Sequence, residues 1–444
     1  MAENHVTIIG GGLAGAEAAY QAATHGARVR LYEMRPEVAT PMHRTGLLAE
    51  LTGGSSFGLD RPDRATGLLI AELRRLGSLI IQAADATRLM DSSLLTVDRL
   101  AFAEYVTERI QQHPDIELCR QAGDTVALTG PAVIATGPMT AAALARSLFR
   151  VTGQEYCFFY GATEPLIEAA SLDAEATWLQ ARFDEDQPAY RNCALTEQQF
   201  ERFLAVLEKA GSGLPEGLSS DDILNQYLPL EVAAAEGDRP LSAGPLNPAG
   251  LRPPGSDQQP FGVCQLCPDD AEHSVYRAVN LRTGLPPPEQ QRLFSNVAGL
   301  ERAEFVRHGG LHRAVYINSP ALLQPTYELR RRPGLLLAGA IAGVVGYAAV
   351  AASGWLAGIN ALRRLQDQEP VMLPAEALCG AMTRVLVTAA PESFRPLAVN
   401  FGMLPADAIA GDIPKEQRRA AQAEQAFAAL DDFMEHNKLK PAEL

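Results

Sequence analysis

The segment Val6-Thr-Ile-Ile-Gly10-Gly-Gly12-Leu-Ala-Gly15 decides the fold of this chain. Its four apolar residues are typical of a buried strand, and the pattern Gly-x-Gly-x-x-Gly follows them directly. Residues 16–25 are rich in alanine and predict a helix, which Gly26 can end. Residues 28–32 predict a second strand. Together they predict a β-α-β unit of the kind that binds dinucleotides.

Each glycine of the pattern has a separate physical role. Gly10 allows a tight turn, and Gly12 lets a pyrophosphate approach the backbone closely. Gly15 allows the helix to pack on the sheet, so that the helix N-terminus faces the phosphates. Glu33 ends the second strand, where a carboxylate can accept hydrogen bonds from both ribose hydroxyls, and Met34 follows it at the same site. These residues predict an adenosine diphosphate without a 2′-phosphate.

Two later segments favour FAD over NAD as the cofactor. Val133-Ile-Ala-Thr136-Gly137 has the strand and turn that two-domain flavoproteins place beside the dinucleotide. Leu337-Ala-Gly339-Ala-Ile-Ala-Gly343 predicts a strand and a glycine-rich turn, followed by a buried helix from about Tyr347 whose N-terminus can face a flavin. A nucleotide segment hundreds of residues after the first is an FAD pattern, so we predict FAD.

The 444 residues predict an α/β protein. We expect a Rossmann-like FAD-binding domain, of the two-dinucleotide-fold flavoprotein type, with an inserted α+β domain. Its first part should cover residues 1–160, the inserted substrate domain 161–324, and its second part, with a C-terminal helical tail, 325–444. Within this frame, residues 65–84 predict one amphipathic helix, and residues 211–260 predict a loop-heavy region.

Composition excludes several classes of protein. A hydrophobic share of 47% with 20% charged residues excludes disorder as the main state. The formal net charge is −15 and four residues are lysine, so the broad basic surface of a nucleic-acid binder is missing. Residues 334–362 carry no charge but are interrupted by glycines, and we predict a buried strand and helix there rather than a membrane span. The absence of a secretory pattern predicts a cytoplasmic protein, with the oligomeric state left open.

Over nearly its whole length the chain resembles the folate- and FAD-dependent tRNA (uracil-5-)-methyltransferase family, TrmFO. The matching segments are residues 10–36, 41–43, 67–85, 97–99, 135–138, 192–193, 244–246, 311–313, 316–318 and 389–405. Such proteins use methylenetetrahydrofolate as carbon donor and FADH2 as reductant to make ribothymidine in the tRNA T-loop. The resemblance implies a tetrahydrofolate derivative as second ligand, with His312 stacked on it and Arg313 beside it, and NAD(P)H as a candidate reductant.

The chain departs from the family where the family holds its reactive thiols. The two family cysteine positions are Gly53 and Tyr227 here. Methyl transfer to uracil needs a thiolate to attack the ring, and neither replacement supplies one. Further polar family positions are changed as well, at Asn247, Cys267, Val345 and Ala349. Intact flavin motifs beside these losses predict changed or lost chemistry, and the catalytic residues stay unassigned.

Other cysteines are candidates to replace the missing thiols: Cys193, Cys264 and Cys267. Cys264-Gln-Leu-Cys267 has the spacing of a redox pair or half of a metal site. Residues three apart on a strand face opposite sides, and no second cysteine pair completes a zinc site. We therefore favour core thiols in a strand and predict no metal.

Three functions follow from these observations. The favoured one is a flavoprotein oxidoreductase that binds a folate-like small molecule and has lost cysteine-dependent tRNA methylation, with tRNA not favoured as a partner. The first alternative is an active methylenetetrahydrofolate-dependent methyltransferase that makes m5U in the T-loop. The second alternative is a non-catalytic flavin-binding partner protein.

Overall fold

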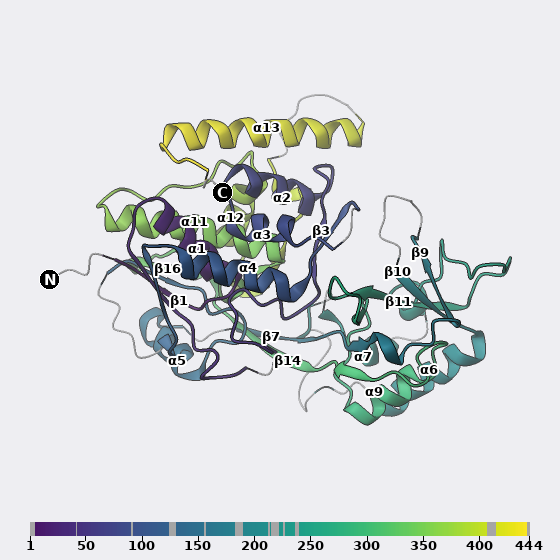
Figure 1. Ribbon diagram of the computed structural model, residues 1–444. Coiled ribbons are helices and arrows are strands. Elements are labelled where there is room, and N and C mark those ends of the chain that lie inside the picture. Colours follow the sequence, from purple (N-terminus) through teal and green to yellow (C-terminus); the bar gives the residue numbers. More distant parts are fainter. Residues whose placement is uncertain are drawn as a thin grey trace.

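A computed structural model describes residues 5–40, 42–89, 92–123, 130–154, 157–182, 190–211, 214, 222–224, 227–235, 239–405 and 414–441. Two domains lie side by side (Figure 1). The larger one is built from both ends of the chain and has its own hydrophobic core, and the smaller one is built from the middle of the chain around a second core. The predicted α/β class and the Rossmann-like domain with an insertion are confirmed.

The larger domain is organised around a six-stranded sheet. Its order is β15 (Glu328–Leu329), β16 (Arg332–Leu337), β6 (Ala132–Ile134), β1 (Val6–Ile9), β2 (Val29–Tyr32) and β5 (Ile116–Cys119). All neighbouring strands are parallel except β15, which runs antiparallel to β16. The carboxyl ends of β1, β2, β6 and β16 therefore meet at one edge of the sheet, which is where open α/β sheets bind ligands.

Helix α1 (Leu13–Thr24) follows β1 and packs against the long helix α11 (Tyr347–Leu365). Small residues allow this contact, because a Cβ on Gly354 would lie 2.3 Å from the carbonyl oxygen of Ala14, and a Cβ on Gly358 would lie 2.5 Å from that of Ala18. The glycines that interrupt the apolar segment 334–362 thus serve helix packing. No helix in the described part of the chain is long and apolar enough to span a membrane.

The helix predicted over residues 65–84 is two helices, which corrects the expectation. Helix α2 (Ala65–Arg75) ends at a turn, and α3 (Leu79–Ala86) starts anew. Gly77 adopts a φ of +69°, which continues no right-handed helix. Ser78 then caps α3 by accepting a hydrogen bond from the Ile81 N–H at 3.3 Å. The apolar spacing continued across the break because both helices bury the same face.

The larger domain contains further helices and short strands. Helix α4 covers residues 99–112, and α13 confirms the C-terminal helical tail predicted within residues 325–444. Their bounds, with the other elements of the domain, are β3 (Ser56–Leu59), β4 (Leu94–Thr96), α4 (Arg99–Gln112), α5 (Ala142–Thr152), α10 (Ser319–Leu322), η5 (Gly339–Ala342), β17 (Val344–Val345), α12 (Leu378–Thr388), η6 (Pro391–Ser393), β18 (Leu397–Ala398), η7 (Phe401–Met403) and α13 (Lys415–His436).

The smaller domain contains an antiparallel six-stranded sheet. Its order is β13 (Phe305–Arg307), β8 (Leu166–Glu168), β12 (Val275–Ala278), β11 (Gly262–Pro268), β10 (Tyr190–Leu195) and β9 (Thr177–Gln180). Its helices are η2 (Ala169–Ser171), α6 (Glu197–Ala210), α7 (Leu230–Ala234), α8 (Arg239–Ser242) and α9 (Pro287–Phe294). Part of the region 211–260 lies outside the described residues, and α7 and α8 are short helices in its described part.

Two long strands connect the domains (Figure 1). Strand β7 (Cys157–Ala162) pairs antiparallel with β14 (Leu311–Tyr316), and His312 lies opposite Gly161 in this register. The larger domain's core includes residues from both strands. The sheet of the smaller domain therefore begins at Leu166 and ends at Arg307, inside the segment 161–324 that we propose as the substrate domain.

A buried ion pair holds the two domains together, and its loss should destabilise the protein. Arg99 of α4 donates to Asp269 of the smaller domain at 2.7 Å, and both side chains are buried. Arg99→Gln leaves the carboxylate buried without its cation, so we expect the free energy of unfolding to fall by about 3 kcal/mol at pH 7. Urea denaturation measures this change. The exposed pair of Arg30 with Glu117 offers a control, because Arg30→Gln should leave stability unchanged.

The Arg99–Asp269 pair also predicts how this loss of stability depends on pH. Burial alone would raise the pKa of Asp269, but Arg99 holds the pKa below its ordinary value of 3.8. The stabilisation is therefore complete above that value and is lost as the pH falls through the lower pKa of the folded state. A loss on Arg99→Gln that is as large at pH 2 as at pH 7 would contradict this assignment.

Candidate functional site

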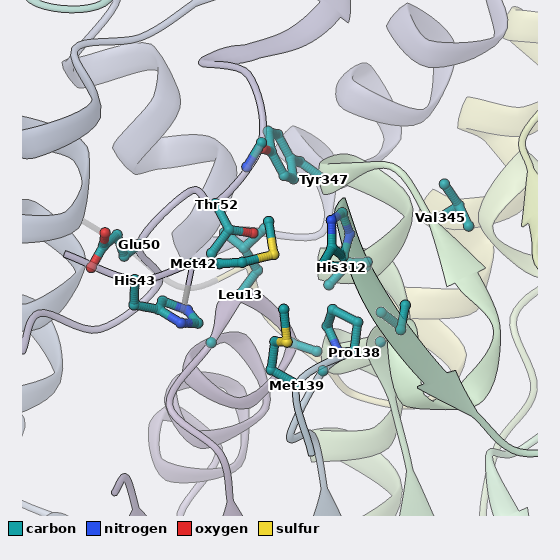
Figure 2. A pocket seen from close by; sticks show the side chains of 18 of the residues that line it. Leu13, Met42, His43, Glu50, Thr52, Pro138, Met139, His312, Val345 and Tyr347 are labelled. Carbon is teal, nitrogen blue, oxygen red and sulfur yellow. The ribbon is translucent and has the colours of Figure 1, made fainter. Parts of the chain in front are cut away.

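A cavity of about 600 Å³ opens at the carboxyl edge of the parallel sheet and extends to the smaller domain. The turns after β1, β2, β6 and β16 line one end, and strands β7, β12 and β14 bring residues of the inter-domain side. In Figure 2 the imidazole of His312 projects into the same space as Met42, Thr52, Pro138 and Tyr347.

The turn between β1 and α1 fits a bound diphosphate. Gly10 has a φ of +103°, and a Cβ on Gly15 would lie 1.7 Å from the Gly10 carbonyl oxygen. A Cβ on Gly12 would meet no atom within 4 Å, so this glycine faces the open cavity. Gly12 precedes α1 without a side-chain cap, which leaves the first N–H groups of the helix available to phosphate oxygens.

Glu33 lines the cavity at the end of β2 with Met34 beside it. One carboxylate oxygen accepts from the Gly11 N–H at 2.8 Å, and the other accepts from the Nε of Arg35 at 2.9 Å. Burial would raise the pKa of Glu33, but the hydrogen bonds and charge of Arg35 hold it below its ordinary value. The carboxylate is therefore ionised. Its Oε1 also accepts from the Arg35 N–H at 3.0 Å, so Oε2 is the oxygen that keeps a lone pair for a ribose hydroxyl.

The two later segments reach the same cavity. Thr136 and Gly137 line it after β6, and Gly339 lines it after β16. Helix α11 begins beside it, with Gly346 at a φ of +98° and no side-chain cap. Gly343 is not a lining residue, since a Cβ there would lie 2.7 Å from the Phe394 ring, and it serves the turn with a φ of +76°.

His312 and Arg313 lie on opposite faces of β14. His312 lines the cavity, and burial lowers its pKa to about 4, so the imidazole is neutral at physiological pH. Arg313 is exposed, and its guanidinium lies over the Phe158 ring at 4.2 Å from the centroid. Successive strand residues alternate in direction, so Arg313 does not line the cavity with His312, and its contact with the ligand stays a prediction.

The two positions that the family resemblance predicts for the missing cysteines, Gly53 and Tyr227, both line the cavity. At Gly53, the N–H donates to the Tyr347 hydroxyl at 3.1 Å, and that hydroxyl donates to the Gly54 carbonyl at 2.8 Å. Tyr227 stacks on Phe159 with ring centroids 5.9 Å apart. Burial raises the pKa of Tyr227 to about 12, so its phenol stays neutral.

The six cysteines of the chain are all described, and none lines this cavity. Cys193 and Cys264 are register partners on β10 and β11, both fully buried in the smaller domain's core, and burial raises the pKa of each thiol. Cys267 is also buried, with a raised pKa. No group of residues suited to a metal ion occurs in the described part of the chain.

Sequence reasoning missed the charged residues at the inter-domain end of the cavity. Glu164, Arg277 and Arg282 line it there, together with Asn280. It also missed Tyr347 as a cavity residue and assigned no role to His43, which lines the opposite end. The arginines stand in no motif, and their convergence on Glu164 arises from a contact between distant segments. No local signal could have found them.

Comparisons with known proteins match the whole chain. The family described as "Glucose inhibited division protein A" matches residues 5–369. A protein of Natranaerobius thermophilus named methylenetetrahydrofolate–tRNA-(uracil-5-)-methyltransferase TrmFO is 40% identical over 430 residues, which cover 97% of this chain and 99% of that protein. A protein of the same name from Heliobacterium modesticaldum is 41% identical over 434 residues, covering 97% and 98%. Among solved structures, Aquifex aeolicus GidA in its form II crystal has a TM-score of 0.72 at 17% identity, covering 98% of this chain and 73% of that one, which shows a shared fold.

Proposed function

Because this chain belongs to the TrmFO group of the glucose inhibited division protein A family, we propose that it is an FAD-dependent, folate-linked enzyme that no longer methylates tRNA through a thiol. Residues that would hold FAD are Gly10, Gly12, Glu33, Met34, Thr136, Gly137 and Gly339, which share the cavity. FAD bound there would supply two-electron redox chemistry. Gly15 supports this site through packing.

One observation carries the loss of methylation. The cavity holds no thiol among the described residues, and the two family cysteine positions carry Gly53 and Tyr227. The Tyr347 hydroxyl closes the first position, because a Cβ on Gly53 would lie 2.9 Å from it. A neutral phenol stacked on Phe159 occupies the second. Since a thiolate activates the uracil ring for carbon transfer, this wall of the cavity lacks the nucleophile.

A folate-like second ligand is supported by His312. Its neutral imidazole face lines the cavity next to the turns that would hold the flavin, and a pterin ring can stack on such a face. The chain's own contribution is to orient this ring and to exclude water with the surrounding Leu13, Pro138 and Tyr347 (Figure 2). The net charge of −15 supports a small molecule rather than tRNA as the substrate.

The alternative is an active methyltransferase that uses tRNA. The observation in its favour is the printed name of relatives that share about 40% of their residues with this chain over its whole length. The two functions differ in one measurable product, which is ribothymidine in tRNA.

The proposed function is tested by measuring flavin content and then turnover. We expect FAD to co-purify at close to one per chain. We also expect NADPH- or NADH-driven reduction that accelerates when methylenetetrahydrofolate is added. A protein that takes up no FAD would contradict the proposal. FAD without turnover by either donor would favour a non-catalytic flavin-binding partner protein.

A variant of His312 tests the folate contact. We expect His312→Ala to weaken binding of 5-formyltetrahydrofolate roughly fivefold, because stacking on an aromatic ring contributes about 1 kcal/mol, while FAD content stays unchanged. Fluorescence titration of the flavin measures both quantities. The control is His308→Ala, since His308 stacks on Phe305 in the smaller domain and does not line the cavity.

The pH dependence gives a second readout. Burial holds the pKa of His312 at about 4, so folate affinity should show no inflection from this group between pH 6 and 8. Unchanged affinity in His312→Ala would leave this histidine with a structural role alone.

A further inference from the structure

Two arginines face one carboxylate at the inter-domain end of the cavity. Glu164 accepts from Nη1 of Arg277 at 2.6 Å, and its other oxygen lies 3.1 Å from Nη2 of Arg282. The Asn280 N–H donates to the same oxygen at 2.8 Å. Burial would raise the pKa of Glu164, but the arginines hold it below its ordinary value, so the carboxylate is ionised. It neutralises one of the two guanidinium charges.

No neighbouring carboxylate among the described residues balances the second guanidinium charge. Asp269 is already paired with Arg99 at 2.7 Å. Arg307 adds a further, half-buried cation, whose Nη2 donates to the Glu164 carbonyl at 3.3 Å. Burial, with the nearby charge of Arg99, lowers the pKa of Arg307 to about 10, so it remains charged at neutral pH. Among the described residues, this end of the cavity therefore carries an excess of positive charge.

Hydrogen-bond donors are in excess as well. A guanidinium carries five N–H groups. Arg277 is 5% exposed, and its buried Nε has no hydrogen-bond partner in the described part of the chain. Arg282 lies 3.4 Å from the Asn280 side-chain oxygen through Nη1, which is a weak contact. Buried donors of this kind usually have acceptors, so the site is suited to an additional one.

The two arginines differ in the contacts that hold them and in the exposure of their side chains. Arg277 is fixed between Glu164 and the Gly54 backbone, where an added Cβ would lie 3.2 Å from its Cζ. Arg282 keeps 24% of its side chain exposed and lines the cavity. Arg282 is thus placed to contact a ligand, and Arg277 is placed to add positive charge beside it.

At the opposite end of the cavity the charges are already balanced, because the cations Arg35 and Arg120 lie near the carboxylates Glu33 and Glu50. There Arg35 pairs with two carboxylates, at 2.9 Å from Glu33 and 3.4 Å from Glu50. A ligand with a neutral, hydroxyl-rich part suits that end. A ligand with an anionic group suits the inter-domain end, and the planar guanidinium fork matches the two oxygens of a carboxylate.

We propose that the inter-domain end of the cavity is a carboxylate-binding subsite, in which Arg282 contacts a carboxylate of the second substrate and Arg277 is a positioning residue held by Glu164. The inference rests on the proposed function, because it specifies the second ligand of the same cavity. The carboxylate belongs either to the glutamate part of a folate or to a separate small carboxylic acid.

Calorimetric titration of the FAD-loaded protein with three probes tests the subsite. The probes are 5-formyltetrahydrofolate, which has ring and carboxylates, 6-methyltetrahydropterin, which has the ring alone, and succinate, which has carboxylates alone. We expect Arg282→Gln to weaken binding of a carboxylate-bearing probe about tenfold and to leave the affinity for the pterin unchanged. Arg282→Lys should recover part of the loss, since it keeps the charge without the fork. Arg292→Gln is the matched control, because Arg292 is 65% exposed and pairs with Glu289 on α9.

The outcomes separate the two sources and the two proposals. A loss confined to 5-formyltetrahydrofolate assigns the subsite to a folate, and a loss of succinate binding assigns it to a separate acid. The subsite would be overturned if Arg282→Gln weakened binding of the pterin equally. It would also be overturned if this variant left the affinity for both carboxylate-bearing probes unchanged, or if the unmodified protein bound neither of them. Flavin content is measured first. A protein without FAD sinks the proposed function, whereas calorimetry needs no flavin signal and still decides the subsite.

Discussion

Methyl transfer to a tRNA transcript is expected to be at least about a thousandfold slower for this protein than for a relative that carries both thiols. Removal of a covalent nucleophile costs an enzyme that much or more. By the family resemblance, Gly53 and Tyr227 stand at the thiol positions, and the cavity contains no cysteine among the described residues. The measurement uses labelled methylenetetrahydrofolate, FAD, NADPH and a transcript, with ribothymidine quantified after digestion.

Variants at positions 53, 227 and 347 test whether the thiols alone are missing or whether other catalytic groups are missing as well. In Gly53→Cys with Tyr227→Cys, the new Cβ at position 53 crowds the Tyr347 hydroxyl at 2.9 Å. Adding Tyr347→Phe removes that hydroxyl. We expect neither variant to form ribothymidine, because the family resemblance also predicts lost polar residues at Asn247, Cys267, Val345 and Ala349. A rate in the unmodified protein comparable to that of the thiol-bearing relative would refute the proposed loss.

If weak transfer appears, the remaining thiols are tested next. Cys193→Ser and Cys264→Ser should leave such activity unchanged, because both side chains are fully buried in the core of the smaller domain. A loss of transfer in either variant would show that the smaller domain rearranges to expose a thiol.

Gly15→Val should abolish FAD binding, which is the second large effect. A Cβ at this position would lie 1.7 Å from the Gly10 carbonyl oxygen, and a branched side chain forces α1 away from β1. Helix and turn then no longer present their N–H groups to the diphosphate. Flavin absorbance of the purified protein after incubation with excess FAD measures the loss, and circular dichroism reports whether the chain is folded.

Two further variants keep this prediction testable when Gly15→Val fails to fold. Gly12→Ala places a methyl group in the open cavity, where an added Cβ meets no protein atom, so it should fold and bind FAD more weakly. Gly310→Ala also meets open space but lies outside the FAD site, so it should bind FAD normally. Normal FAD binding by a folded Gly15→Val would show that the turn after β1 is not the phosphate site.

The dinucleotide half of the site could be read from the sequence, because its signal is local. Glycines at fixed spacing, a strand before them, a helix after them and Glu33 at the next strand end are consecutive features of one β-α-β unit. The late turn at Gly339 is local in the same way and joins the first unit because parallel strands end at one edge. These predictions rested on residue patterns within short segments.

Local sequence patterns did not reveal two features: the backbone angle that ends a helix, and the direction in which a strand side chain points. Apolar spacing over residues 65–84 could not reveal that Gly77 breaks the helix, because both helices bury the same face. Likewise, the resemblance grouped His312 with Arg313, whereas strand alternation turns Arg313 out of the cavity toward Phe158.

The sequence alone therefore determined the parallel-sheet fold and the flavin-type turns, since these depend on residue identity and short-range spacing, and it carries the prediction that the two family cysteines are missing. The tertiary structure alone decided what fills the cavity wall. The Tyr347 hydroxyl reaches Gly53 across almost three hundred residues, and Glu164 gathers Arg277 and Arg282 from a different strand and turn. The physical reason is that charge balance and hydrogen-bond satisfaction are set by proximity in space, which the order of residues does not express.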